Sequence, residues 1–356
     1  MHATTVGVDL AKSVFEVAVA NEGYRVVRRT RLSRARFEQF CAQQPASVFV
    51  MEACGSAHHW GRRLSALGHQ VRLLPAQYVR AYVKRNKTDR ADAAALIEAA
   101  RCAEIAPVPV KTVEQQYLQQ LHRLREQYKS TRNARINLLR GCLREFGLVI
   151  PKGIGRGMVA MREALSIADN GLPDGIRPWV FAVLEEIAHL QEPMRRIERE
   201  LEAFARNDEL VQRWLQAPGI GLLGASALRA QVGDFQRFRS GRHFASYLGI
   251  PARESSSGER RRLGRMSKRG DVYLRTLLIH GARSALAAAQ RADKAGRPLD
   301  GLRRWALSTE RRIGMNKATV ALANKLARMV WAMAKYERPF DGNWSARHQP
   351  VLSRAA

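Results

Sequence analysis

Cysteine is scarce in this sequence, and its few copies are not arranged as metal ligands or disulfide partners. They lie far apart and form no C-x-x-C motif: Cys41, Cys54, Cys102 and Cys142. The pattern therefore indicates neither a structural zinc site nor a disulfide framework, and we expect reduced thiols. The nine histidines are also dispersed along the chain, so we expect structural or surface roles for them.

Long apolar runs are also missing. No uninterrupted apolar stretch approaches the ~18 residues that a membrane-spanning helix needs. The N-terminal segment "MHATTVGVDL" has an acidic residue where a signal peptide has its apolar core. We therefore expect a cytoplasmic protein that does not contact a membrane.

Acidic residues are few relative to basic ones. The chain of 356 residues has 32 Asp and Glu against 60 Lys and Arg, which gives a formal net charge of +28. Such an excess predicts a polyanionic partner, and nucleic acid is the first candidate. The length is sufficient for two domains of ordinary size, each with its own core.

The first hundred residues alternate between predicted strands and helices. The segment "TTVGVDLAKSVFEVAVANEGYRVVRRTRL" indicates three short strands, with "NEG" as a hairpin turn. A helix with Ser33 as its N-cap, a buried strand that ends at Glu52, a helix that ends at Gly68 and the strand "HQVRLLP" are expected next. Largely helical sequence then continues to about residue 105. This order predicts an α/β domain.

Residues 106–112, "APVPVKT", form a proline-marked linker that precedes two long helical patterns. Residues 113–146 contain almost no glycine and place apolar residues mostly three and four positions apart. A second apolar series is more regular: Leu184, Ile187, Leu190, Met194, Ile197, Leu201 and Phe204. We expect a long antiparallel helical pair or a coiled coil, which could pack within one chain or join two chains.

The C-terminal part is expected to be mainly α-helical. The turn "PGIG" between two helical patterns resembles a helix-hairpin-helix element, in which Gly219 and Gly221 would let backbone amides bind a DNA phosphate. A plain connection between helices uses glycine in the same way. We expect three parts in all: an α/β domain over residues 1–106, a helical coiled-coil region over residues 107–207, and a C-terminal domain over residues 208–345.

Four carboxylates have the order that a two-metal site needs. Asp9 ends the first strand, Glu52 ends a later buried strand, and Asp89 and Asp92 lie one turn apart on a helix in "KTDRADAAAL". Two divalent ions such as Mg²⁺ or Mn²⁺ require several carboxylate oxygens gathered from separate segments. The nearby Lys87 suits a nucleic-acid backbone as substrate. Each acid also has an ordinary alternative as a turn residue, a helix cap or part of a solvated helix face.

The order of strands, helices and acids is that of the ribonuclease H-like fold in its RuvC-type variant. The chain resembles the DEDD transposases of bacterial insertion sequences, the IS110 family, and most closely the IS1111 subgroup. The matching segments span nearly the whole chain: "GVDLAKSVFEV", "VMEACGSAHHW", "NKTDRADA", "APGIG", "FASYLGIPARESSSGERRRLGRMSKRGDVYLR" and "KATVALANKLARMVWAM".

This resemblance implies a RuvC-like N-terminal domain, a helical linker, and a C-terminal transposase domain that carries a nucleophilic serine. It assigns the family's four acids to Asp9, Glu52, Asp89 and Asp92. Counting eight residues beyond Gly249 gives Ser257, directly before Gly258. The chain has "IPA" where the family usually has "LTP", and it has three consecutive serines. A gap of one residue would make Ser256 the nucleophile.

A cluster of basic residues follows the serines. The side chains expected to bind phosphate oxygens there are Arg260, Arg261, Arg262 and Lys268. From composition alone, "ESSSGERRR" would be a flexible polar loop, and the sequence after it indicates another helix. The match to the family favours the catalytic interpretation.

The resemblance also implies partners. Family members work as dimers and tetramers on donor and target DNA, and some use a structured non-coding bridge RNA to select both. Two other functions remain open from the residues themselves. One is a junction-specific nuclease that hydrolyses DNA with the four acids alone. The other is a nucleic-acid-binding protein without catalytic activity.

Overall fold

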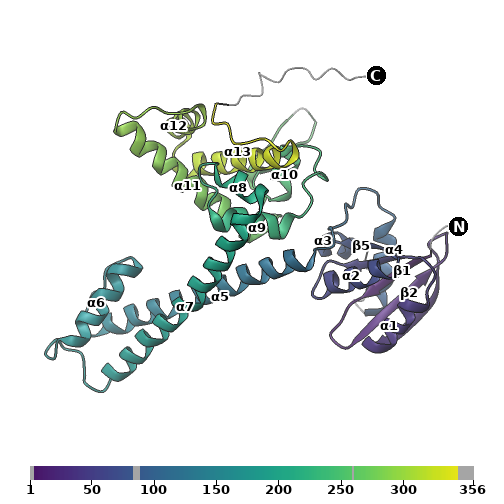
Figure 1. Cartoon of the computed structure of the whole chain (residues 1–356), viewed down its shortest axis with the longest axis horizontal. Helices are drawn as coiled ribbons and strands as arrows, with labels where there is room; N and C mark the ends of the chain where they lie inside the picture. The colour runs from purple at the N-terminus through teal and green to yellow at the C-terminus, as the bar shows by residue number, and fades with distance from the viewer. Residues whose placement is uncertain (1–3, 83–88, 259, 344–356) are drawn as a thin grey trace. The chain divides into compact units, whose positions relative to one another are not determined.

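The computed structural model describes residues 4–82, 89–258 and 260–343 (Figure 1). Strands are concentrated near the N-terminus, and the remainder is mainly α-helical. In these described ranges we find no helix that combines the length and the apolar character of a membrane span.

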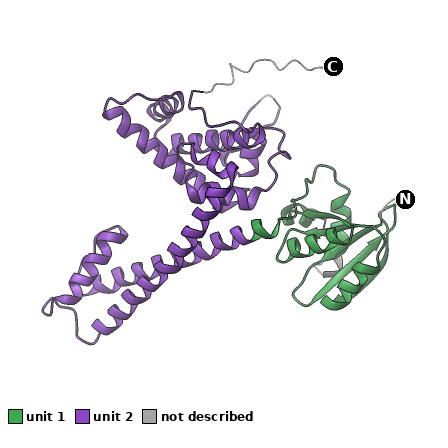
Figure 2. Ribbon diagram, in the orientation of Figure 1, with its two compact units in different colours: residues 1–116 green, residues 117–356 purple. Residues whose placement is uncertain are grey.

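The chain divides into two compact units, residues 1–116 and residues 117–356 (Figure 2). The proline-marked linker belongs to the first unit, because Val108 forms a β-bridge with Leu73. The Val110 side chain also packs against the core of that unit. The three-part division expected from the sequence remains a prediction.

A mixed five-stranded sheet forms the centre of the first unit, with the strand order β3-β2-β1-β4-β5. Its strands are β1 (Thr5–Asp9), β2 (Val14–Ala20), β3 (Val26–Ser33), β4 (Val48–Glu52) and β5 (Gln70–Leu74). Pairing is antiparallel from β1 to β2 and from β2 to β3, and parallel from β1 to β4 and from β4 to β5. The three opening strands predicted from the sequence are confirmed.

Helices cover both faces of this sheet. They are α1 (Arg34–Gln43), α2 (Ala57–Ala66), α3 (Ala76–Val79), the 3₁₀ helix η1 (Arg80–Tyr82) and α4 (Asp89–Ala100). Phe37 of α1 and Trp60 of α2 pack with Phe15 on one face, whereas Ala93 and Ile97 of α4 pack on the other face. This arrangement is consistent with the ribonuclease H-like fold.

The N-cap of α1 and the end of α2 predicted from the sequence are confirmed. Ser33 is the N-cap of α1, because its hydroxyl accepts a hydrogen bond from the backbone N–H of Arg36 at 3.4 Å. The chain leaves α2 through Gly68, whose φ of +84° suits glycine.

Two long helices, α5 (Val113–Glu145) and α7 (Arg177–Asn207), pair within the second unit, with α6 (Ile154–Ser166) between them in sequence. Leu143 shares a buried cluster with Val180, and Leu118 shares another with Leu201. The helices are therefore antiparallel, as predicted, and they pack against each other within one chain. Ion pairs such as Arg125–Glu198 at 2.6 Å support the pairing.

The rest of the second unit is mostly helical, as the sequence indicates. Its helices are α8 (Glu209–Leu215), α9 (Leu222–Val232), α10 (Gly241–Tyr247), α11 (Val272–Lys294), α12 (Gly301–Ile313) and α13 (Met315–Lys335). Their common core includes the fully buried Trp214 and Phe244. The Trp214 indole N–H donates to the carbonyl of Val330 at 3.0 Å, which satisfies its buried polar group.

The serine- and arginine-rich segment after α10 connects two short antiparallel strands that the sequence does not predict, β6 (Ala252–Glu254) and β7 (Leu263–Met266). The three serines and the three arginines after them lie in the connection between these strands. The hairpin lacks the alternation of apolar and polar residues that identifies a half-buried strand, because all three residues of β6 are exposed.

Candidate active site

Asp9 and Glu52 lie at the same edge of the sheet. Asp9 is the last residue of β1 and Glu52 is the last residue of β4. These strands are parallel, and Val8 is in register with Met51. The next residue of each strand is an acid, so the two carboxylates leave the sheet from neighbouring strands, which lie about 4.8 Å apart.

A close approach of α4 to β1 determines where the third described acid lies. A Cβ atom on Gly7 would lie 2.4 Å from the carbonyl oxygen of Ala93 and 2.9 Å from Cγ1 of Ile97. Only glycine therefore lets α4 lie this close to the strand. Asp92 directly precedes Ala93, so this contact brings its turn of helix against β1. Gly7 was not identified from the sequence, although a glycine inside the strand "TVGVD" was the available signal.

The Asp92 carboxylate has an unusual environment. Its Oδ1 atom is buried and has no hydrogen-bond partner among the described residues. Burying an unpaired carboxylate oxygen is unfavourable, so native proteins usually supply a partner. A divalent cation bound at this oxygen would be such a partner.

The nearby Cys54 thiol reports on the negative charge at this edge. Its pKa is raised first by burial and then by the carboxylates of Glu52 and Asp9. Both carboxylates therefore lie close enough to Cys54 to disfavour its thiolate. Among the residues that the structure describes, no group of three metal-binding side chains is assembled. The Asp89 side chain and the whole of Lys87 lie outside the described part.

The serines lie on the β6–β7 hairpin and differ in their contacts. The Ser255 N–H donates to the Arg262 carbonyl at 2.9 Å. The Ser256 hydroxyl donates to Oε1 of Glu254 at 2.8 Å and accepts from the Arg262 N–H at 3.3 Å. Within the described part of the hairpin, the Ser257 hydroxyl has no hydrogen-bond partner, and the residue is exposed. The Ser255 hydroxyl is likewise exposed and has no hydrogen bond within the described part of the hairpin, so only the Ser256 hydroxyl is engaged.

The basic residues of the hairpin are exposed, as expected for phosphate binding. Arg260 and Arg262 are exposed, whereas Arg261 forms an ion pair with Glu254 at 3.2 Å. The hydrogen bond from Ser256 and the positive charge of Arg261 lower the pKa of the Glu254 carboxyl. Lys268 is exposed and adopts a φ of +56° at the base of the hairpin.

The base of the hairpin is held by a buried arginine that the sequence reasoning missed. Arg275 is only 6% exposed, and its guanidinium donates to the carbonyls of Leu248 and Gly270, each at 3.1 Å. A Cβ atom on Gly270 would lie 2.1 Å from the carbonyl oxygen of Tyr247. These contacts fix the chain on both sides of β6 and β7, while the hairpin itself stays exposed.

The "PGIG" turn lies between α8 and α9. Gly219 has a φ of +86°, and a Cβ atom there would lie 2.5 Å from the carbonyl oxygen of Gly281 in α11. Helix packing therefore explains Gly219. Gly221 differs, because a Cβ atom there would meet no neighbour within 4 Å, and it precedes the first turn of α9 without any side-chain cap.

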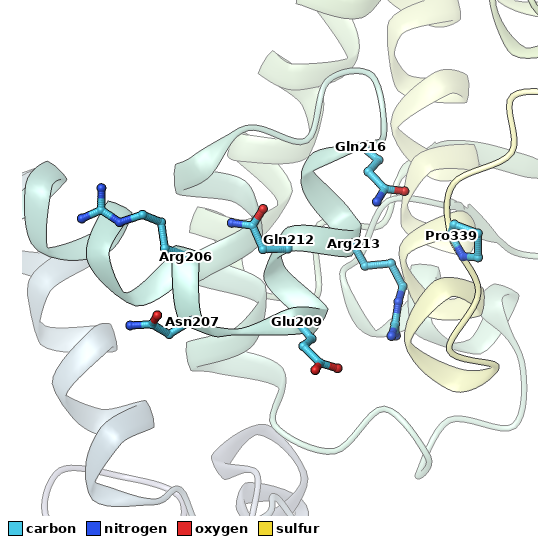
Figure 3. A pocket seen from close by; sticks show the side chains of 7 residues that line it. All are labelled: Arg206, Asn207, Glu209, Gln212, Arg213, Gln216 and Pro339. Atoms are coloured by element: carbon cyan, nitrogen blue, oxygen red, sulfur yellow. The ribbon is translucent and has the colours of Figure 1, made fainter.

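Two cavities lie away from the sequence-predicted residues. One of about 330 Å³ is bordered by α8 and the chain after α13 (Figure 3). The other, of about 690 Å³, is lined by residues that include Thr5 and Val48. These two residues begin β1 and β4, so the second cavity lies at the edge opposite Asp9 and Glu52.

Two family profiles match the chain. Residues 6–147 match the DEDD transposase profile of the IS110 type, described as "Transposase". Residues 211–296 match the profile described as "Transposase IS116/IS110/IS902 family". All four acids lie within the first matched range, and Ser257 lies within the second.

Similar proteins cover almost the full length of the chain. A "Probable family 20 transposase" of Pseudomonas aeruginosa is 42% identical and covers 95% of this chain and 98% of its own. The "Transposase for insertion sequence element IS1111A" of Coxiella burnetii is 38% identical, covering 92% of this chain and 88% of its own. The "Transposase for insertion sequence element IS1328" of Yersinia enterocolitica is 36% identical and covers 93% of this chain and 97% of its own.

Proposed function

Because the chain belongs to the IS110 family of insertion-sequence transposases, we propose that it cuts and rejoins DNA with a carboxylate site and a serine nucleophile. The enzyme is a transposase and binds DNA. The observation that carries the carboxylate part is the buried, unpaired Oδ1 of Asp92 beside the strand that ends in Asp9.

DEDD domains use divalent metal ions, and the residues here fit such an ion. Asp9, Glu52 and Asp92 would hold Mg²⁺ or Mn²⁺, together with Asp89 from the same helix as Asp92. Carboxylate oxygens are the ligands that these hard cations prefer. When bound, the ions would activate the attacking group and stabilise charge on the leaving oxygen. The sheet edge holds two of the carboxylates in fixed positions, which such a site requires.

Ser257 is the proposed nucleophile. Its oxygen forms a bond to phosphorus, the bond from phosphorus to the leaving DNA oxygen breaks, and the hydroxyl proton passes to a base or to water. The product is a phosphoserine ester and a free DNA hydroxyl. A second DNA hydroxyl can then attack the ester, which rejoins the strand and restores the serine. The hydrogen bonds of Ser256 favour Ser257 for this role, because the Ser256 hydroxyl is already engaged.

The basic hairpin residues and the α9 turn are proposed to bind the substrate. Arg260, Arg262 and Lys268 would contact phosphate oxygens, with Lys87 contributing near the acids. Gly221 would allow backbone amides at the start of α9 to approach a phosphate, with Gly219 shaping the turn. The net charge of +28 supports extensive contact with nucleic acid.

Guided target choice and assembly complete the proposal. The resemblance to family members supports a structured bridge RNA that pairs with donor and target DNA, and a dimer or tetramer acting in the cytoplasm. The acids of one protomer would then act together with the serine of another.

Replacing Asp92 tests the carboxylate site. Asp92→Asn should abolish cleavage of the element's terminal DNA in Mg²⁺ and leave DNA affinity nearly unchanged, because this acid holds metal and does not contact phosphate. Glu98→Gln is the matched control, since Glu98 lies on the same helix and pairs with Arg101 at 3.0 Å. Cleavage by Asp92→Asn at the parental rate would refute the assignment.

A junction-specific nuclease is the second candidate. It is favoured by the concentration of the described acids in one compact unit, residues 1–116, because hydrolysis would need nothing from the second unit. This function predicts hydrolysed ends and no dependence on Ser257.

A further inference from the structure

A row of charged residues on neighbouring strands runs from Asp9 of β1 across β2 to β3, along the carboxylate edge of the sheet. Asp9 of β1 is in register with Glu16 of β2, and Glu16 is in register with Arg31 of β3. Neighbouring strands are about 4.8 Å apart, so Arg31 lies about 10 Å from Asp9 along this row. Its side chain is 70% exposed and makes a loose ion pair with Glu16 at 3.5 Å.

Arg34 follows at the same edge, and its guanidinium is held in place by contacts that do not neutralise its charge. Its Cζ lies 5.8 Å from the ring centre of Phe15 and 5.3 Å from that of Trp60. Its Nη1 donates to the Lys12 carbonyl at 3.4 Å, in the turn directly after Asp9. An arginine stacked on aromatic rings keeps several N–H donors directed toward solvent.

The position of Arg34 is unfavourable for the helix that begins there. Arg34 and Arg36 lie in the first turn of α1, where the helix dipole repels positive charge. Within this fully described turn there is no acidic residue to offset them. The dipole of α1 therefore opposes the charge of Arg34, which an anion bound at this edge would offset.

More positive charge gathers beside Arg34. The pKa of His59, in the first turn of α2, is lowered by partial burial and then by the charges of Arg62 and Arg34. Arg62 is itself fixed, since its Nη1 donates to the Lys111 carbonyl at 2.7 Å. The α2 helix follows β4 and Glu52, so this cluster lies at the same edge of the sheet as the acids, on the face covered by α1 and α2.

We propose that Arg34, with Arg31 at the same edge of the sheet, binds a backbone phosphate of the nucleic acid adjacent to the phosphate that is cut at the carboxylate edge. The proposal rests on the proposed function, because it takes the acids as the cutting site. The ligand is a phosphodiester, which duplex DNA and double-stranded RNA both supply. Arg34 is thus a substrate-positioning residue of the first unit.

The test compares Arg34→Gln with Arg34→Lys and with Arg63→Gln. Arg63 is a matched control in the same unit, because it forms an ion pair with Glu38 and its removal changes the net charge equally. Affinity for a labelled duplex DNA and for a double-stranded RNA of the same sequence is measured across a series of salt concentrations. A thermal melt of each variant verifies folding.

Arg34→Gln should weaken binding about tenfold, as expected for one charge-assisted phosphate contact. It should also reduce the slope of log affinity against log salt by about 0.9 on DNA. Arg34→Lys should recover part of the loss, and Arg63→Gln should match the parent. A loss of affinity for the duplex DNA would support the proposal, whereas a loss confined to the RNA would contradict a position beside the phosphate that is cut.

Cleavage separates this proposal from the proposed function. Arg34→Gln should raise the KM for the element's terminal DNA and largely preserve kcat, whereas Asp92→Asn should remove kcat. Parental affinity and KM for folded Arg34→Gln, on both polymers, would overturn the Arg34 proposal and leave the carboxylate assignment intact. A parental kcat for Asp92→Asn would instead refute the proposed function, while the binding results would still decide the role of Arg34.

Discussion

The two candidate reaction centres are built in opposite ways. Asp9 and Glu52 end β1 and β4, strands in which the three residues before each acid are buried. Ser257 lies on a hairpin whose first strand is wholly exposed. Rigid packing therefore defines the carboxylate site, whereas the described contacts of the serine hairpin with the helical core are at its base, where Arg275 and Gly270 pack and the Lys268 N–H donates to the Gly249 carbonyl at 3.0 Å.

This difference agrees with the chemistry that each centre would perform. Metal ligands must be positioned to within a fraction of an ångström, which a packed sheet provides. A nucleophile that attacks a DNA strand and is then displaced by a second DNA hydroxyl needs room on both sides of the phosphate. An exposed hairpin provides that room, and binding of DNA would complete its alignment.

The largest expected effect comes from disturbing the packed centre at Gly7. Gly7→Ala places a Cβ atom 2.4 Å from the Ala93 carbonyl oxygen, so α4 must move away from β1. We expect loss of cleavage and destabilisation of about 3 kcal/mol, measured by urea unfolding. Gly55→Ala is the control, because a Cβ atom there meets nothing within 4 Å. Parental cleavage by Gly7→Ala would contradict the role of this contact.

The helical pair that follows the first unit offers a second comparison. Leu121 is 8% exposed and belongs to a buried cluster with Ile197, whereas Leu124 is 50% exposed. Leu121→Ala should therefore destabilise the fold by about 3 kcal/mol. Leu124→Ala should change stability little, and it should weaken self-association if α5 also contacts another chain. Both effects can be read from thermal unfolding and sedimentation. Equal destabilisation by the two changes would contradict the packing.

A smaller, pH-dependent effect is expected at the base of the serine hairpin, where His122 of α5 bonds to Tyr273 and Ser226. The Ser226 hydroxyl donates to the Leu222 carbonyl at 2.6 Å, so Nε2–H of His122 donates to the Ser226 oxygen at 3.1 Å. Nδ1 then accepts from the Tyr273 hydroxyl at 3.0 Å. Burial, followed by the charge of Arg125, lowers the pKa of His122 to about 4.

Because the folded-state pKa is below the value of about 6.5 in the unfolded chain, the unfolded state binds the proton first as pH falls. Neutral His122 therefore contributes its full stability above about pH 6.5, and this stability is lost as the pH falls toward about 4. We expect a loss of about 2 kcal/mol between about pH 7 and about pH 5. Urea unfolding of the parent and of His122→Gln should show a smaller pH dependence in the variant. Identical pH profiles would contradict this role of His122.

The sequence predicted the carboxylate half of the molecule better than the serine half, for physical reasons. Asp9 and Glu52 end β-branched, apolar runs, and parallel strands necessarily bring their ends to one edge. The helix with Ser33 as its cap was also readable from local residues. For these strands and this helix, the local residue pattern and the folded structure agree.

The features that the sequence does not predict depend on contacts between segments that lie far apart in the chain. The contact of Gly219 with Gly281 joins a turn to a helix far along the chain, and no local pattern records it. The same is true of Gly7 against Ala93 and of Arg275 with Leu248. The β6–β7 hairpin was missed because its residues are polar and exposed, so they lack the periodicity that reveals a strand.

The most direct test of the account is to trap the bond to Ser257. A cleavage reaction quenched in denaturant should leave DNA covalently attached to the protein, because a phosphoserine ester survives unfolding. Ser257→Ala should lose this adduct and all strand exchange, whereas Ser255→Ala and Ser256→Ala should keep both, with peptide mass identifying the attached residue. An adduct on Ser256 would overturn the assignment of the nucleophile. Cleaved ends that accumulate with no serine of the hairpin attached to DNA would contradict the rejoining mechanism and favour the hydrolytic nuclease.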